Sequence, residues 1–222
     1  MKRSLFLLLL IFCWLFLHGA TFCDYAAELP AKDMRAALGD RAGAIAFYEQ
    51  AINIIPDPSF VAALGDLYKG EGRHKEAERQ YKLVEVIAKL NLYSRQEALF
   101  YADHNLNPQT AYSIAVQEYA VRKDIYGADA VAWTALKAGK LDEAKSAIAE
   151  AMRLGTQDAK LWYHAGEIAQ AAGDDNSAIR YFNLVSSVNP EFDPLQSSIM
   201  KKDLTNTVYR RQTSEPLSAQ HK

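Results

Sequence analysis

Small and bulky hydrophobic side chains recur along this chain at a nearly constant interval. Alanine marks the interval, with neighbouring copies 33 or 34 residues apart, at Ala44, Ala77, Ala111, Ala144 and Ala178. Bulky side chains follow several of these alanines by four residues, and glycines precede most of them by five residues. A period near ~34 residues with helix–turn–helix content is typical of stacked helical hairpins. The pattern therefore predicts an all-α repeat array.

Each recurring residue type has a mechanical role in such an array. Small residues such as Ala44 and Gly65 suit the points where two helices cross closely. Bulky residues such as Tyr48 and Phe182 fill the space one turn further along the same face. Glycine ends a helix by adopting a left-handed conformation. The turns within hairpins are therefore predicted at Gly39, Gly72, Gly139 and Gly173.

The same periodicity places the helices. After a short helix from Pro30 to Leu38, they are predicted at 41–54, 59–70, 74–89, 94–104, 108–123, 128–138, 142–154, 159–172 and 175–188. Asp142 and Asp193 have the side chain that suits an N-cap. A further helix at 194–204 would cap the last repeat, as solenoids require. The remaining residues are polar and weakly patterned, which predicts a disordered tail within 193–222.

The repeats resemble the tetratricopeptide repeat (TPR) family. In residues 158–190 the family's signature sites hold Trp162, Ala165, Gly166, Gly173, Ala178, Phe182 and Pro190, and an earlier stretch matches through Leu64, Gly65, Tyr68, Ala77 and Tyr81. The run from Glu118 to Ala169 is similar to exported bacterial repeat proteins.

This resemblance implies a right-handed α-solenoid of stacked antiparallel helix pairs, the TPR superhelix, over residues 30–192. A degenerate first hairpin at 30–56 precedes units at about 58–91, 92–124, 125–157 and 158–192. The unit at 92–124 departs from the pattern, with Leu106 at the turn, Ala115 at the bulky site and Glu118 at a small site. Its Asn107-Pro108 pair suits an N-cap followed by proline at the first helical position.

The N-terminus has the composition of a secretory signal. Lys2 and Arg3 precede an uncharged apolar stretch from Leu5 to Leu17, and small residues follow. This arrangement predicts a signal peptide at 1–20, cut after Ala20, because a spanning helix needs ~20 apolar residues. Export to the periplasm or the extracellular space follows, with an uncleaved membrane anchor as the alternative. Residues 21–29 are predicted to be irregular.

Cysteine adds one open question. Cys13 lies in the signal, so the mature chain would keep Cys23 as its single thiol and could form no internal disulfide. Cys23 resembles the lipid-modified cysteine of bacterial lipoproteins, although Phe22 stands where that motif has a small residue. The alternative is a free thiol in a mobile N-terminal segment. A membrane is thus expected as a partner only through an uncleaved anchor or a lipidated Cys23.

Composition and charge exclude several classes of function. The formal net charge is −2 for 222 residues, and loss of Lys2 and Arg3 with the signal makes it more negative. Nucleic-acid binding calls for a basic face, which this balance does not supply. Histidine is present at positions 18, 74, 104, 164 and 221, without a second histidine or a cysteine at metal-ligand spacing. His164 has two interpretations, a ligand contact and, more plainly, a groove or interface histidine.

Catalytic motifs are also missing from the sequence. It has no glycine-rich phosphate loop, nucleophile elbow or cysteine–histidine pair. We therefore expect no enzyme activity, no metal and no cofactor. Some TPR proteins clamp a peptide carboxylate with lysine and asparagine, but the central sites here hold Asp66, Phe100, Trp133 and Glu167.

The fold implies where a partner would bind. The first helix of each unit lines the concave face, and its residues not needed for hairpin packing should point into the groove. These are Asp66, Lys69, Tyr93, Gln96, Phe100, Asp103, Tyr126, Asp129, Trp133, Lys137, Lys160, Tyr163 and Glu167. An aromatic ladder with a polar rim is typical of peptide-binding surfaces. Helical spacing alone leaves Phe100 and Trp133 as either groove or core residues.

The sequence predicts a non-enzymatic scaffold or adaptor that binds a protein or peptide segment in its concave groove. The alternatives are a structural module that assembles through its convex face or ends, and an accessory subunit of an enzyme or transporter.

Overall fold

A computed structural model of the chain describes residues 40–90 and 93–214. The chain divides into residues 1–44 and 45–222, and of the first part only 40–44 are described. The predicted signal peptide (1–20), the irregular segment (21–29), the helix from Pro30 to Leu38, the turn at Gly39 and Cys23 all lie outside the described residues. So does the end of the tail, at 215–222.

The described residues fold into helices without β-strands, which confirms the all-α prediction. The α-helices are α2 (Arg41–Ile54), α3 (Pro58–Gly70), α4 (His74–Ala88), α5 (Ser94–Asp103), α6 (Pro108–Val121), α7 (Ile125–Lys137), α8 (Leu141–Ala151), α9 (Ala159–Ala171), α10 (Asp175–Val188) and α11 (Gln196–Ser214). A short 3-10 helix, η1 (Met152–Leu154), follows α8.

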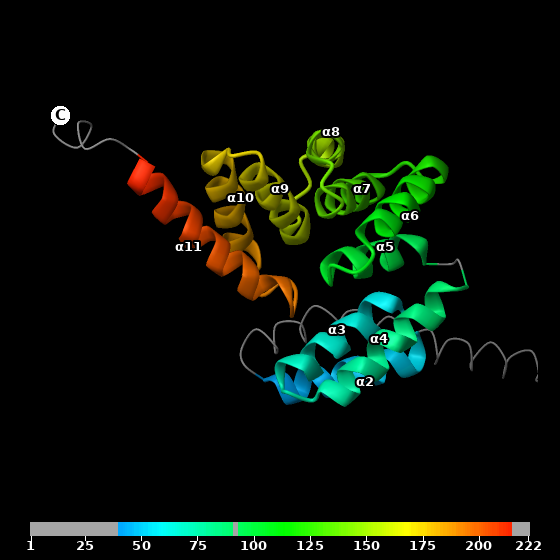
Figure 1. Cartoon of the computed structure of the whole chain (residues 1–222). Helices are drawn as coiled ribbons and strands as arrows, with labels where there is room; N and C mark the ends of the chain where they lie inside the picture. The colour runs from blue at the N-terminus through cyan, green and yellow to red at the C-terminus, as the bar shows by residue number, and fades with distance from the viewer. Residues whose placement is uncertain (1–39, 91–92, 215–222) are drawn as a thin grey trace, which may run out of the picture. The chain divides into compact units, whose positions relative to one another are not determined.

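Within residues 45–222, consecutive helices pack as pairs. The pairs are α3 with α4, α5 with α6, α7 with α8 and α9 with α10 (Figure 1). Adjacent pairs contact one another through their first helices, α3 with α5, α5 with α7 and α7 with α9, and also through consecutive helices, α4 with α5, α6 with α7 and α8 with α9. This succession is the stacking of an α-solenoid.

The recurring small residues lie where helices cross. The five period-marking alanines are on α2, α4, α6, α8 and α10 and are almost fully buried. Gly166 on α9 shows why a small residue is needed. A Cβ atom there would lie 2.4 Å from Cε1 of Phe182 on α10, so the glycine lets the aromatic ring pack against the backbone. Gly65 of α3 has the same relation to the Tyr81 ring.

The turns within hairpins also follow the prediction. Gly173 lies in the turn between α9 and α10 and has a φ of +78°, a conformation that costs glycine little. Gly72 and Gly139 adopt the same left-handed conformation in their turns. In the unit at 92–124, asparagine replaces glycine in the turn, since Asn105 and Asn107 have positive φ. Asn107 occupies the predicted N-cap position with Pro108 as the first helical residue, although the Asn107 side chain makes no capping hydrogen bond.

Four helix starts differ from the prediction, and those of α3 and α11 are shifted by one and two residues. Helix α7 begins at Ile125 rather than at residue 128, because the Asp124 side chain accepts a hydrogen bond from Gly127 N at 2.7 Å. Helix α8 begins at Leu141, so Asp142 lies in the first turn and Lys140 takes the N-cap position.

The C-terminal helix is much longer than expected. The prediction of a helix at 194–204 followed by a disordered tail is wrong for residues 205–214, which belong to α11. Thr207 is fully buried and receives a hydrogen bond from Gln170 of α9, and Arg210 forms an ion pair with Asp175 of α10. These long-range contacts hold a segment whose polar sequence gives little sign of helix.

Candidate functional site

The structure sorts the thirteen predicted groove residues by exposure. Phe100, Asp129, Trp133 and Tyr163 are buried; Asp66, Tyr93, Gln96, Asp103, Lys137, Lys160 and Glu167 are partly buried; Lys69 and Tyr126 are exposed. Tyr93 stands at the N-cap of α5, and Tyr126 lies in the first turn of α7. The central members come together, whereas Lys69 and Tyr126 lie apart from them in solvent.

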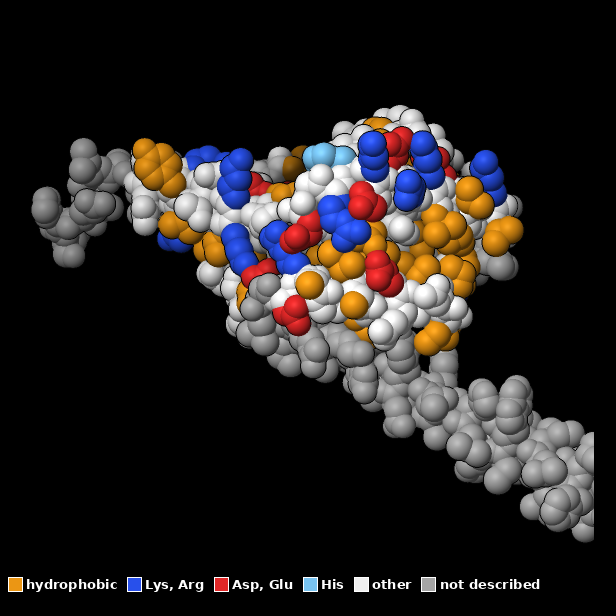
Figure 2. All heavy atoms as spheres, turned by 90° about the horizontal axis from the view of Figure 1, so that it is seen from below, with side chains coloured by type: hydrophobic (Ala, Val, Ile, Leu, Met, Phe, Trp, Pro, Cys, Tyr) orange, Lys and Arg blue, Asp and Glu red, His pale blue; other side chains and the backbone are white. Residues whose placement is uncertain are grey.

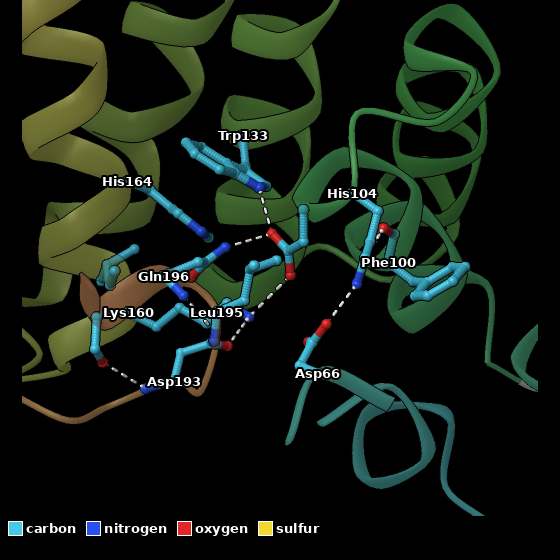
Figure 3. A network of polar contacts seen from close by, with 12 residues as sticks. Asp66, Phe100, His104, Trp133, Lys160, His164, Asp193, Leu195 and Gln196 are labelled. Atoms are coloured by element: carbon cyan, nitrogen blue, oxygen red, sulfur yellow. Dashed lines mark hydrogen bonds and ion pairs between the residues drawn. The ribbon is translucent and has the colours of Figure 1, made fainter. Parts of the chain in front are cut away.

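Asp103, the last residue of α5, is the centre of a polar network. Its partners Trp133, Lys160 and Gln196 are labelled in Figure 3. Its Oδ1 accepts hydrogen bonds from Trp133 Nε1 of α7 at 2.7 Å and from Gln196 Nε2 of α11 at 2.5 Å. Its Oδ2 accepts one from Lys160 Nζ of α9 at 3.2 Å. One carboxylate therefore joins four helices from three successive repeats and the C-terminal segment.

Lys160 connects this network to the segment before α11. Its Nζ also lies 3.4 Å from Oδ2 of Asp193, whose Oδ1 accepts backbone N–H groups of Leu195 and Gln196. Burial opposes the charged lysine, but the carboxylates of Asp103 and Asp193 outweigh it and raise its pKa. Burial likewise opposes ionisation of Asp193, yet Lys160 and the two N–H donors lower its pKa. Both groups are therefore charged at neutral pH.

The predicted aromatic ladder is an interior cluster rather than an exposed surface. Trp133 is 1% exposed and stacks on the His164 ring with centroids 4.3 Å apart. His164 is fully buried, and its Nδ1 is hydrogen-bonded to Asp129 at 2.9 Å. His164 is therefore not available as a surface contact. Trp133 and Tyr163 pack in one core cluster, which answers the question of groove or core for the tryptophan.

A second polar cluster joins α3 to α5. Asp66 accepts a hydrogen bond from the Tyr81 hydroxyl at 2.7 Å and lies 2.9 Å from Nε2 of His104. Burial opposes protonation of His104, but Asp66 and the Phe100 carbonyl outweigh it and raise the histidine pKa. Phe100 is 4% exposed and packs against Tyr81, so it too belongs to the core.

Little open space remains between these two clusters. A cavity of about 100 Å³ is lined by Pro58, Ala62, Asp66, Gln96 and Asp103 among others. That volume is of the order of one side chain. In the described part of the chain, this stretch of the predicted inner face is thus largely filled by the protein's own residues. A more open hollow of about 580 Å³ lies beside Lys137, Glu167 and Asp203.

The far end of the face carries a pair of carboxyl groups. Glu167 of α9 faces Asp203 of α11, and its Oε1 is buried without a hydrogen-bond partner among the described residues. Burial and the nearby Asp203 raise the pKa of Glu167 to about 7. Lys137 lies beside them, with Nζ 4.3 Å from the centre of the Trp133 ring.

Several residues of these networks escaped the sequence prediction. The sequence pattern indicates only hairpin packing for Tyr81, no role for His104, and a place in the capping helix for Gln196. The N-cap chemistry of Asp193 and the need for a helix that caps the last repeat point to the C-terminal segment, but neither indicates its contacts with Asp103 and Lys160. The contact of Gln196 with Asp103 spans 93 residues, so local patterns cannot find it.

Metal binding and membrane spanning find no support in the described residues. No group of three or more His, Cys, Asp or Glu there is placed to hold a metal ion. No helix in the same ranges combines the length and the apolar composition needed to cross a bilayer. On the face shown in Figure 2, basic and acidic side chains are interspersed, with hydrophobic ones between them.

Comparison with known proteins bears on the fold. A family model described as tetratricopeptide repeat matches residues 34–58 and 159–192. A tetratricopeptide repeat protein from Parabacteroides merdae has a similar solved structure, with 17% identity, a TM-score of 0.52, and coverage of 80% of this chain and 68% of that chain. A thermophilic TPR protein of Thermus thermophilus is 14% identical with a TM-score of 0.52, covering 83% of this chain and 99% of that one. No curated protein matches the sequence.

Proposed function

Since the chain is a member of the tetratricopeptide repeat family, whose domains generally bind protein or peptide partners, we propose that it is a non-enzymatic scaffold. It binds a protein segment on the inner face formed by α5, α7 and α9, and it acts outside the cytoplasm. One observation carries the choice of surface. Asp103 and Lys160 on this face already hold a stretch of polypeptide, the chain's own residues 193–196.

The chemistry of the inner face suits a protein ligand. Asp103 and Lys160 offer one acceptor and one donor that are charged and partly buried, so they favour matching groups over water. The apolar cluster of Trp133 and Tyr163 lies directly behind them. Aromatic anchors behind a polar rim are common in protein interfaces.

Capture from the envelope fraction of the source cells tests the proposal. Immobilised full-length protein is compared with the variant Lys160→Ala, which removes the ammonium group but no core side chain. We expect a specific partner that the wild type retains and the variant loses. Capture of the same proteins by both, or turnover of a small molecule by the purified chain alone, would contradict the scaffold at this face.

Assembly through the outer surface is the second candidate function. Leu83, Val86 and Leu90 lie on and just after α4 with exposed fractions of 36%, 58% and 63%. Neighbouring exposed apolar side chains of this kind mark interaction surfaces. The variant Val86→Lys should abolish such an assembly and leave capture at the inner face intact, so the two variants separate the two functions.

The extracytoplasmic location rests on the sequence of residues 1–20. A fusion of residues 1–30 to a reporter enzyme that is active only after export should be active. Mass spectrometry of the mature N-terminus then distinguishes cleavage after Ala20 from an uncleaved anchor and from a lipidated Cys23. A reporter that stays inactive, with an intact unmodified N-terminus, would contradict export.

A further inference from the structure

The inner face is occupied by the start of the C-terminal segment. Phe192 packs on the ring of Tyr163 with centroids 5.2 Å apart, and Asp193 pairs with Lys160. Met200, one helical turn after Gln196, is fully buried in the cluster that contains Tyr163. These residues make the kinds of contact that a bound peptide would make.

The same segment is attached by a narrow interface. After Met200, helix α11 contributes few buried side chains. Ile199 and Tyr209 of the same helix are 39% and 69% exposed. Helix α11 packs mainly on α10. Most of its surface is polar, so the hydrophobic effect holds the helix mainly through Met200 and the partly buried Leu204.

Two features make the docked position costly. Oε1 of Gln196 is buried without a hydrogen-bond partner among the described residues, and so is Oε1 of Glu167, which faces α11. A buried polar atom without a partner costs free energy, because it has lost its hydrogen bonds to water. Release of α11 would return both atoms to solvent. The docked and released states are therefore closer in free energy than the buried contacts alone suggest.

We propose that residues 192–207 are a resident competitor at the partner-binding face, and that the partner is a helix with the same chemistry. This inference rests on the proposed function. The partner helix carries an aromatic residue, an acidic N-cap directly after it, an amide three residues later and an apolar residue four further on. It enters the site as α11 leaves.

Each element of that pattern answers a group on the face. An aromatic ring fills the place of Phe192 on Tyr163. A carboxylate takes the place of Asp193 beside Lys160, so that the ammonium keeps an ion pair on each side. An amide donor satisfies Asp103, and an apolar side chain fills the space of Met200.

Competition between α11 and a partner for the inner face predicts a distinctive experimental result. A tethered segment acts at a high effective concentration, so it lowers the apparent affinity of any ligand that needs the same face. Only the fraction of molecules with α11 released can bind. Damage to α11 should therefore strengthen partner binding, whereas damage to the face should weaken it.

A synthetic peptide with the sequence of residues 190–214, carrying a fluorescent label, is the probe. It is titrated into the full-length wild type, the double variant Gln196→Ala/Met200→Ala, and the matched control Tyr209→Ala, which changes an exposed residue of the same helix. We expect the double variant to bind the probe at least about tenfold more tightly than the wild type and the control. Adding Lys160→Ala to the double variant should remove that gain.

Amide hydrogen exchange distinguishes local release of α11 from unfolding of the whole variant. The single variant Gln196→Ala should raise amide exchange in α11 while α7 and α9 keep their protection. Equal probe affinity for all variants, with unchanged exchange in α11, would overturn the inference. So would a wild-type dimer, found by light scattering, in which each copy holds the other copy's α11.

The outcome also separates this inference from the scaffold proposal. If the probe binds the double variant but no envelope protein is retained by it, the inner face binds helices and the proposed function alone fails. If an envelope partner is retained equally by wild type and double variant, and lost with Lys160→Ala, the scaffold stands and the resident competitor fails.

Discussion

The carboxyl pair between α9 and α11 makes a pH-dependent contribution to stability that one substitution can isolate. Glu167 faces Asp203, its Oε1 is buried, and burial together with Asp203 raises its pKa from 4.5 to about 7. Burial also raises the pKa of Asp203. Lys137 of α7 and Lys202 of α11 are the cations that act on the pair. The substitution Glu167→Gln removes the ionisable group and keeps the shape of the side chain.

The direction in which the free energy of unfolding changes with pH follows from proton binding. Between pH 4.5 and about 7 the folded chain keeps a proton on Glu167 that the unfolded chain has released. The folded state then binds more protons, so the free energy of unfolding falls as pH rises through this window and levels off above it. Glutamine has no proton to lose, so the variant lacks this decline.

The magnitude follows from the same shift. One pKa unit corresponds to about 1.4 kcal/mol, so the rise from 4.5 to about 7 sets an upper bound of about 3.5 kcal/mol. Glu167 is partly exposed, and solvent reduces the effect, so we expect Glu167→Gln to gain about 1–3 kcal/mol at pH 8. Below pH 4.5 the variant and the wild type should be equally stable. The gain corresponds to a melting temperature higher by about 2–4 °C for each kcal/mol.

Urea unfolding followed by circular dichroism at several values between pH 4 and pH 8.5 measures the difference. The control Glu85→Gln changes an exposed glutamate of α4 and should follow the wild type throughout. A constant difference between Glu167→Gln and the wild type across the range would refute the reasoning. So would a variant that is less stable than the wild type at pH 8.

Three further predictions concern packing, capping and titration. Gly166→Ala should lower the free energy of unfolding by about 1–3 kcal/mol in urea titrations, since its Cβ would lie 2.4 Å from Phe182; an unchanged midpoint would contradict the close contact. Asp158→Ala should cost about 1 kcal/mol, because its side chain accepts two backbone N–H groups at the start of α9, and Asp158→Asn should restore most of it. Asp66→Asn should lower the pKa of His104, seen as an NMR titration displaced to lower pH; an unmoved titration would show that Asp66 does not hold the proton.

Local signals explain why much of the helix map could be predicted. Pro58 and Pro108 mark the first residues of α3 and α6, and Gly72 and Gly173 mark the turns that follow α3 and α9. These signals act within a few residues, so the sequence carries them directly. The prediction was wrong for 205–214, where helix formation depends on contacts with α9 and α10 rather than on local preference.

Much less of the candidate site could be predicted from the sequence. The sequence placed Asp103, Trp133 and Lys160 on successive inner helices, which follows from the repeat period. It could not show that their polar atoms meet, nor that Gln196 completes the network from a helix 93 residues away. The sequence did not predict solvent exposure either. Trp133 and Tyr126 lie on one helix, yet Trp133 is buried and Tyr126 is exposed.

The sequence by itself determined the repeat: small and bulky residues return every 33 or 34 positions, and this interval fixes paired helices that bury one face against the next pair. The tertiary structure alone decided how the inner face is used. Burial, ion pairing and the raised pKa of Glu167 all arise where α11 meets earlier repeats, and such meetings depend on how the pairs stack. A period along the chain specifies neighbours in the stack, whereas contacts between distant members depend on the accumulated geometry of every pair between them.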